Sequence, residues 1–191
     1  MTDPIEPRLP ALSDAELPDA LKPILAAWPY RLHRTLAHSP ASLQAWMPWA
    51  EHILRQNRLT PRDREIAILR VAWNAQCAYE WGLHAWVARQ VGMTDPDLTA
   101  VVAGPASPHW NALEAALVRG VDELMQSNRI SDGTWAELSG ALQPDQLIDY
   151  IYVTGQFTTI AWVLNGLQLP SEPGVEPLPE AAGQRSAQQC N

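Results

Sequence analysis

Signals for the start of a helix recur along this chain, and they limit its fold more than any other feature of the sequence. A hydroxyl or acidic residue at the N-cap, followed by a proline in the first turn, suits the backbone N–H groups that a helix start leaves unpaired. Such signals stand at Ser39-Pro40, Thr60-Pro61, Thr94-Asp95-Pro96, Ser131 and Pro144. No segment alternates apolar and polar residues between turn signals, as a half-buried strand does. The sequence therefore predicts an all-α fold.

Apolar residues recur at intervals of three and four after each signal, and they set the expected extent of each helix. The pattern predicts about eight helices: short pieces between residues 13 and 28, then residues 39–57, 61–74, 76–91, 95–103, 110–126, 131–142 and 144–164. We expect a loop at residues 30–38 and a bend at Pro48. The final helix is apolar around most of its circumference, so it should be buried centrally or lie at a subunit contact.

The chain is long enough for one sizeable core with an arm at each end. Its 191 residues are 47% hydrophobic, which predicts a single all-α domain over residues 14–168. The proline-rich residues 1–13 should run extended over the surface. Residues 169–191 hold few apolar side chains and should be disordered or extended. A weak echo between residues 56–60 and 127–131 suggests an internal duplication of a helical module.

Charge and cysteine content exclude several classes of function. The formal net charge is −8, from 21 acids and 13 bases without a basic stripe, so we expect no nucleic-acid partner. The N-terminus lacks the apolar core of a secretory signal, and no stretch approaches the roughly 18 apolar residues of a membrane span. The two cysteines, Cys77 and Cys190, are poorly placed for a structural disulfide. We expect a cytoplasmic protein with no membrane partner.

The strong candidates for chemistry all lie between Glu65 and His84. Cys77, Glu80 and His84 have the spacing i, i+3 and i+7, so on one helix they fall within about 60° of each other. Glu65 lies twelve residues before Cys77 and can fold back from the preceding helix. We therefore expect Glu65, Cys77, Glu80 and His84 to line one pocket.

Proton transfer is one interpretation of this set. Glu80 and His84 are spaced i, i+4, so they can interact on a helix surface. In an apolar cleft, burial raises the pKa of a glutamate, whereas an imidazole titrates near neutrality. Such a pair can protonate and deprotonate carbon acids, with Glu65 as the third group that orients His84.

Three other interpretations stay open. Cys77 near a helix N-terminus could be a peroxidase thiolate, with Cys190 in the tail as the other thiol to resolve it. A set of Cys, Glu and His could bind zinc, although the familiar helical pairings differ from this one. Each residue could instead be structural: Cys77 a small core side chain, Glu65 a surface ion pair and His84 a cap of a carbonyl group.

Substrate contacts are expected from residues near this set. Trp73 and Trp81 are close enough in sequence to supply pocket walls, and His38 could reach a pocket from the segment before residue 39. If the substrate is a carboxylate, Arg70 or Arg34 could receive it. The remaining histidines, His33, His52 and His109, lack such company and are interpreted as structural.

The sequence resembles the superfamily of carboxymuconolactone decarboxylase and alkylhydroperoxidase D. The likeness rests on residues 59–72 (LTPRDREIAILRVA), 77–84 (CAYEWGLH) and 88–92 (ARQVG), and it extends more loosely over residues 30–168. The resemblance implies a helical bundle in which the two motif helices form an antiparallel pair. It also implies a homo-oligomer, a trimer or hexamer with pockets near subunit contacts.

The two branches of this superfamily differ at one position of the motif. The hydroperoxidase branch has Cys-x-x-Cys-x-x-x-His with a glutamate twelve residues before the first Cys; Glu65, Cys77 and His84 match, but Glu80 replaces the second Cys. The form Tyr-Glu-Trp-x-x-His is similar to the decarboxylase-like branch, which moves protons without a cofactor. The resemblance thus implies Glu80 and His84 as acid and base, Glu65 as orienter and Cys77 as a pocket residue.

Together, the residues and the resemblance predict a cofactor-independent enzyme acting on a small cyclic or aromatic-derived carbonyl compound or lactone. Decarboxylation is the best single guess, with isomerisation or other lyase chemistry related to it. The expected site residues are Glu80, His84, Glu65 and Cys77 for catalysis and Trp81, Trp73, Arg70 and His38 for substrate binding, with no metal. A thiol peroxidase using Cys77 and a non-catalytic helical oligomer are the alternatives.

Overall fold

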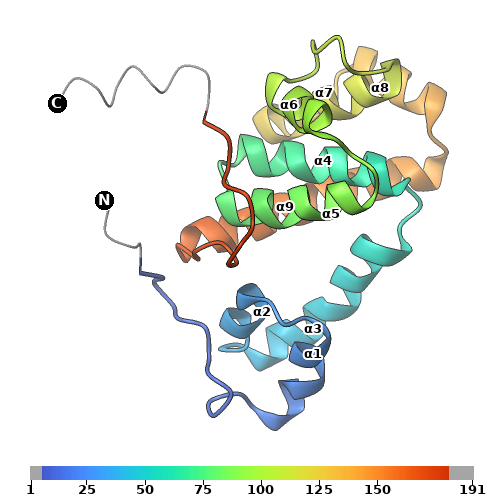
Figure 1. Ribbon diagram of the computed structural model, residues 1–191. Coiled ribbons are helices and arrows are strands. Elements are labelled where there is room, and N and C mark those ends of the chain that lie inside the picture. The colour runs from blue at the N-terminus through green and yellow to red at the C-terminus, as the bar shows by residue number, and fades with distance from the viewer. Residues whose placement is uncertain (1–5, 181–191) are drawn as a thin grey trace, which may run out of the picture.

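The computed structural model describes residues 6–180, and in this range it is a bundle of helices without a strand (Figure 1). The helices are α1 (Lys22–Ala27), α2 (Arg31–Leu36), α3 (Pro40–Glu51), α4 (Pro61–Asn74), α5 (Ala78–Gln90), α6 (Asp95–Ala103), α7 (Ala112–Ser127), α8 (Asp132–Ala141) and α9 (Pro144–Gly166). A 3₁₀ turn (Asp19–Leu21) precedes α1, and a π turn (His52–Gln56) follows α3. The all-α prediction is confirmed. From residue 61 onward, each helix starts and ends within two residues of its predicted extent.

Residues 31–36, expected as part of a loop, form helix α2, so that prediction is wrong. The helix has no side-chain cap. Its start is held by a tertiary contact instead, since the backbone N–H of Leu32 donates a hydrogen bond to the Tyr79 hydroxyl of α5 (3.1 Å). Residues Leu32, His33 and Thr35 are buried. Local spacing could not reveal this helix, because the groups that stabilise it lie elsewhere in the chain.

Capping interactions begin two of the central helices where the sequence places them. The Thr60 hydroxyl accepts a hydrogen bond from the backbone N–H of Asp63 (3.1 Å) at the start of α4. At α6, the Asp97 carboxylate accepts one from the backbone N–H of Thr94 (2.6 Å). Each such cap contributes about 1 kcal/mol. Pro48 lies inside α3 without ending it, and the helix widens into the π turn four residues later.

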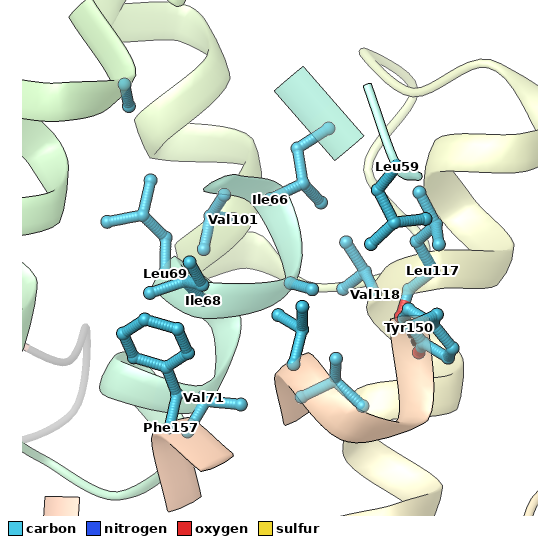
Figure 2. Close-up of a cluster of buried hydrophobic side chains, with 14 of the residues drawn as sticks. Leu59, Ile66, Ile68, Leu69, Val71, Val101, Leu117, Val118, Tyr150 and Phe157 are labelled. Carbon is cyan, nitrogen blue, oxygen red and sulfur yellow. Dashed lines mark hydrogen bonds between the residues drawn. The ribbon is translucent and has the colours of Figure 1, made fainter. Parts of the chain in front are cut away.

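Helix α4 is the centre of the main core. It contacts α5, α6, α7 and α9, and residues 65–72 are buried without interruption. Figure 2 shows this packing, with Ile66, Ile68, Leu69 and Val71 of α4 near Val101 of α6, Leu117 and Val118 of α7, and Tyr150 and Phe157 of α9. Burial of each aliphatic side chain contributes roughly 1.5–3 kcal/mol. The final helix, α9, covers one side of α4 and leaves its own other face exposed.

Helices α1, α2 and α3 form a smaller group set apart from α4–α9 (Figure 1). This group has its own core of Leu17, Leu21, Leu25, Ala37, Leu43 and Met47. A third cluster joins the two groups, with Leu32 from α2, Cys77 and Tyr79 from the start of α5, and Ile160 and Leu164 from α9. The candidate site lies at this junction.

Beyond α9, residues 170–180 run without helix across α5 (Figure 1), and we call them the C-terminal strap. Glu172 of the strap accepts hydrogen bonds from the backbone N–H of Arg31 (2.5 Å) and from the Tyr79 hydroxyl. A Cβ atom at Gly82 of α5 would meet Cγ2 of Val175 at 2.6 Å. The strap therefore ties α2 to α5, and its path requires glycine at position 82.

The two ends of the described chain contain no helix. In the N-terminal arm, the backbone N–H of Arg8 donates a hydrogen bond to the carbonyl oxygen of Leu167 (2.9 Å). Residues 1–5 and 181–191 lie outside the described residues. Cys190, considered above as a resolving thiol, is among them.

Candidate active site

A turn of three residues, Ala75–Cys77, connects α4 to α5 and makes them an antiparallel pair (Figure 1). Gln76 adopts the left-handed backbone conformation (φ 50°), and the backbone N–H of Cys77 donates to the carbonyl oxygen of Ala72 (2.9 Å). The predicted break near Asn74 is confirmed. Because the turn reverses the chain, Glu65 on α4 comes to lie against His84 on α5.

His84 is held by a buried carboxylate. Its Nδ1 lies 2.7 Å from Oε2 of Glu65, and the other oxygen of Glu65 accepts a hydrogen bond from Nε of Arg64 (3.1 Å). A carboxylate paired with arginine only accepts hydrogen bonds, so the proton of the imidazole sits on Nδ1. The ring of Phe157 packs edge-on against the imidazole, with centroids 4.8 Å apart. Nε2 of His84 is left as a proton acceptor of fixed orientation.

Glu80 is a buried acid without a hydrogen bond. Its side chain is 2% exposed, and neither carboxyl oxygen has a hydrogen-bond partner among the described residues. Burial raises the pKa of this carboxyl well above its ordinary value. The residue lies in the first turn of α5, where the helix dipole favours the charged form by about 0.3–1 kcal/mol. Desolvation of an ion costs several kcal/mol, so burial wins and Glu80 is a neutral acid.

Cys77 occupies the N-cap position of α5, as expected, but its thiol is fully buried. It packs in the junction cluster against residues of α2 and α9. Burial raises the pKa of the Cys77 thiol to about 12. The thiol is therefore protonated at neutral pH, whereas a nucleophilic cysteine needs its thiolate.

A cavity of about 70 Å³ that opens to solvent lies between α2, α3, the start of α5 and α9. Most of its wall is aliphatic or aromatic: Trp28, Tyr30, Leu32, Trp46, Ala50, Ile53, Leu54, Tyr79, Leu83, Phe157, Ile160 and Leu164. The polar members of the wall are His33, Glu80, His84 and Gln156. Cys77 is not part of this wall, and no lysine or arginine of residues 6–180 is. The cavity thus suits a small apolar ligand without a charge.

The residues expected to bind substrate lie elsewhere. Trp81 is buried in the main core, where its ring meets that of Trp73 edge-on at 6.2 Å. Arg70 donates to both carboxylate oxygens of Asp122, at 2.6 and 2.8 Å, which ties α4 to α7. His38 bonds the carbonyl oxygen of Pro10 in the N-terminal arm (2.9 Å). Arg34 pairs with Asp14, also in the N-terminal segment (2.5 Å).

His33 was interpreted as structural, yet it lines the same cavity as Glu80 and His84. Its ring lies among three aromatic side chains of the wall, Trp28, Tyr30 and Trp46, with centroids 5.6–5.9 Å apart. The aromatic residues beside it in the sequence, Trp28 and Tyr30, were the available signal for this role. The helix that presents His33 was itself missed, which hid the signal.

Neither a metal-binding cluster nor a membrane-spanning helix is found in the described part of the chain. Among residues 6–180, no group of three or more His, Cys, Asp and Glu side chains is arranged to hold a metal ion. No helix in the same range is long and apolar enough to cross a membrane. What the arrangement can do is acid–base chemistry, because an oriented imidazole and a neutral carboxylic acid face one apolar cavity.

The sequence matches the model of a known family. Residues 40–123 match the sequence model of the Carboxymuconolactone decarboxylase family, which confirms the resemblance predicted from the motif. This stretch contains Glu65, Cys77, Glu80 and His84. Among curated proteins, none matches the chain.

Comparison with solved structures shows the alkylhydroperoxidase AhpD-like helical fold. An uncharacterized peroxidase-related protein from Ralstonia eutropha JMP134, with an alkylhydroperoxidase AhpD core, is 16% identical, with a TM-score of 0.75 over 90% of this chain and 95% of that one. A peroxidase-related protein from Silicibacter sp. TM1040 is 20% identical, with a TM-score of 0.73 over 96% and 98%. The debrominase Bmp8, solved as a variant in complex with 2,3,4-tribromopyrrole, is 14% identical, with a TM-score of 0.73 over 90% and 95%.

Proposed function

We propose that this protein is a cofactor-independent acid–base enzyme that moves a proton at a carbon next to the carbonyl group of a small cyclic compound or lactone. His84 is the base and Glu80 the acid, and Glu65 orients His84. One observation carries the proposal: a neutral, unpaired Glu80 and an imidazole held by Glu65 at 2.7 Å face the same cavity. General acid–base pairs of this kind typically contribute a factor of about 10²–10⁴ to a rate.

The proposed reaction balances without an outside reagent. Nε2 of His84 takes the proton from carbon, and the C–H electron pair forms a carbon–carbon double bond while the carbonyl π pair moves to oxygen. Glu80 then gives its proton to another carbon of the conjugated system, and the carbonyl group re-forms. The proton on His84 returns to the Glu80 carboxylate, so the enzyme ends in its starting state. The net reaction is an isomerisation.

Decarboxylation is the second candidate, and the match of residues 40–123 to the Carboxymuconolactone decarboxylase family favours it. In that reaction Glu80 would protonate the carbon that loses carbon dioxide. The cavity wall argues for isomerisation, because within residues 6–180 it contains no arginine or lysine to receive a carboxylate. Comparing a cyclic enone with its carboxylated analogue as substrates separates the two reactions.

Thiol chemistry has less support in this chain. The second thiol of a Cys-x-x-Cys pair is replaced by Glu80, and Cys77 is buried behind the cavity wall with a raised pKa. The debrominase Bmp8 has a similar fold and was solved with a brominated pyrrole. That likeness supports a small ring compound as the ligand of the cavity.

Exchange of carbon-bound protons tests this function. Cyclic ketones, enones and lactones are incubated with the protein in D₂O, and deuterium uptake next to the carbonyl is followed by NMR. We expect uptake to fall at least about 100-fold in His84→Gln, and conversion of the enones to their isomers to fall at least about 100-fold in Glu80→Gln. Cys77→Ser is the matched control, and it should keep both activities. Loss of both activities in Cys77→Ser with full isomerisation in Glu80→Gln would refute the assignment.

We further propose that the protein is a homo-oligomer, such as a trimer or hexamer, joined through α9. Between residues 148 and 166 the exposed face of α9 carries no charged residue and presents Ile148, Ile151, Tyr152 and Trp162, the last 69% exposed. Copies with a net charge of −8 repel one another, so an uncharged apolar face is the surface best able to pair. Light scattering should give a multimeric mass that Trp162→Glu reduces and Trp135→Glu, on α8, does not.

A further inference from the structure

His33 is a buried group of the cavity wall that proton transfer between His84 and Glu80 does not use. Its Nδ1 is shielded from solvent without a hydrogen-bond partner. The other ring nitrogen, Nε2, is not shielded from solvent. Nε2 also makes no hydrogen bond within the described chain. A buried polar group without a partner costs about 1–3 kcal/mol, so its presence in a binding cavity calls for an explanation.

The surroundings of His33 determine which hydrogen bond it can make. The imidazole lies among the rings of Trp28, Tyr30 and Trp46, and burial lowers the pKa of His33 to about 4. The ring is therefore neutral at pH 7 and carries one N–H group. Nδ1 is walled off, so a proton there would be a donor with no acceptor. The N–H group therefore belongs on Nε2, the ring nitrogen that is not shielded.

We propose that His33 binds the carbonyl oxygen of the substrate, with Nε2–H donating a hydrogen bond to that oxygen while His84 takes the proton from the neighbouring carbon. The inference rests on the proposed function and narrows its substrate class to neutral cyclic ketones and lactones. When the C–H pair becomes a double bond, negative charge develops on the carbonyl oxygen. A hydrogen bond aimed at that oxygen stabilises the intermediate more than the substrate.

The two helices that line the cavity with these residues then have separate tasks. Helix α2 presents His33 to the oxygen, and α5 presents His84 and Glu80 to the carbon atoms. The aromatic rings around His33 form an apolar enclosure in which its hydrogen bond is stronger than in water. A neutral donor suits this role because it stabilises the charge without giving up its own proton, whereas Glu80 must release one.

A pair of matched ligands tests the role of His33 without requiring turnover. Cyclohexanone and methylenecyclohexane have nearly the same shape, and only the ketone has an oxygen acceptor. Binding of each to the full chain is measured by NMR titration. We expect the wild type to prefer the ketone roughly 5- to 10-fold, as one hydrogen bond predicts. The C=O stretching frequency of bound cyclohexanone should fall, which reports the hydrogen bond directly.

Three variants decide the outcome. His33→Phe keeps an aromatic ring, so it should bind methylenecyclohexane as before but lose both the ketone preference and the frequency shift. His33→Gln offers an amide N–H and should restore part of each. His52→Gln, outside the cavity, should match the wild type.

Equal affinity of the wild type for both ligands, or an unchanged preference in His33→Phe, overturns the inference. The proposed function would fail by another result: Glu80→Gln would keep its activity, while the preference for the ketone still depended on His33.

Discussion

Replacing Glu80 with glutamine should make the protein more stable at neutral pH while it removes the proposed acid. The two side chains have nearly the same shape, but glutamine stays uncharged at every pH. In the unfolded chain Glu80 ionises near its ordinary pKa of 4.5, whereas burial keeps it protonated in the folded state. Above pH 4.5 the folded protein therefore binds one proton more than the unfolded chain. Its stability falls as the pH rises, until the pH reaches the folded-state pKa of Glu80.

The size of the effect follows from the proton count. One proton corresponds to about 1.4 kcal/mol per pH unit. Above pH 4.5, the free energy of unfolding of Glu80→Gln should therefore rise relative to the wild type at about this slope. The relative gain should stop growing at the folded-state pKa of Glu80, so the plateau measures that pKa.

His33 acts in the opposite direction and must be separated from Glu80. Its pKa is lowered from 6.5 to about 4 by burial, so between these values the unfolded chain binds the extra proton and stability rises with pH. In the wild type the two slopes oppose each other above pH 4.5, for as long as Glu80 stays protonated in the folded state. In Glu80→Gln the rise due to His33 should stand alone.

Urea unfolding at half-unit steps from about pH 4.5 to 8 measures both curves. Glu137→Gln, an exposed acid on α8 paired with Arg119, is the control and should follow the wild type. If Glu80→Gln and the wild type run parallel across this range, the carboxyl is charged in the folded protein. Glu80 would then not be a neutral acid, and the proton-transfer mechanism would lose its donor.

Three further predictions concern single side chains. In the Glu80→Gln background, where the rise due to His33 stands alone, His33→Phe should abolish the gain in stability between about pH 4.5 and 6.5, about 2.7 kcal/mol, in the same urea series. Gly82→Val should displace the strap and cost about 1–3 kcal/mol, because a Cβ at this position meets Val175 at 2.6 Å. Limited proteolysis should then cut residues 170–180 first. Gly140→Ala on α8, with open space at its Cβ, should not be destabilised. Arg70→Met should cost about 3 kcal/mol by calorimetry, since it leaves Asp122 without its bidentate partner; a loss below about 1 kcal/mol would show that this pair contributes little.

Some features of this protein could be read from the sequence because they depend on neighbours three or four residues apart. The caps at Thr60 and Thr94 are of this kind, and so is the break near Asn74. The contact between Glu65 and His84 joins residues farther apart in sequence, but it depends only on two helices and the short turn between them. Local geometry limits these arrangements so strongly that spacing alone predicts them.

The chemical state of the site was decided by residues that the sequence does not bring together. Cys77 has the N-cap position that suits a reactive thiol, but Leu32, Ile160 and Leu164 bury it. Burial likewise makes Glu80 a neutral acid. The packing of α2 against the rest of the chain puts His33 in the wall of the cavity. Sequence spacing gives the direction of a side chain along its own helix, whereas its exposure and pKa depend on helices that pack from elsewhere in the chain. The motif therefore predicted the contact between Glu65 and His84, and the tertiary packing decided the exposure and protonation of Cys77 and Glu80.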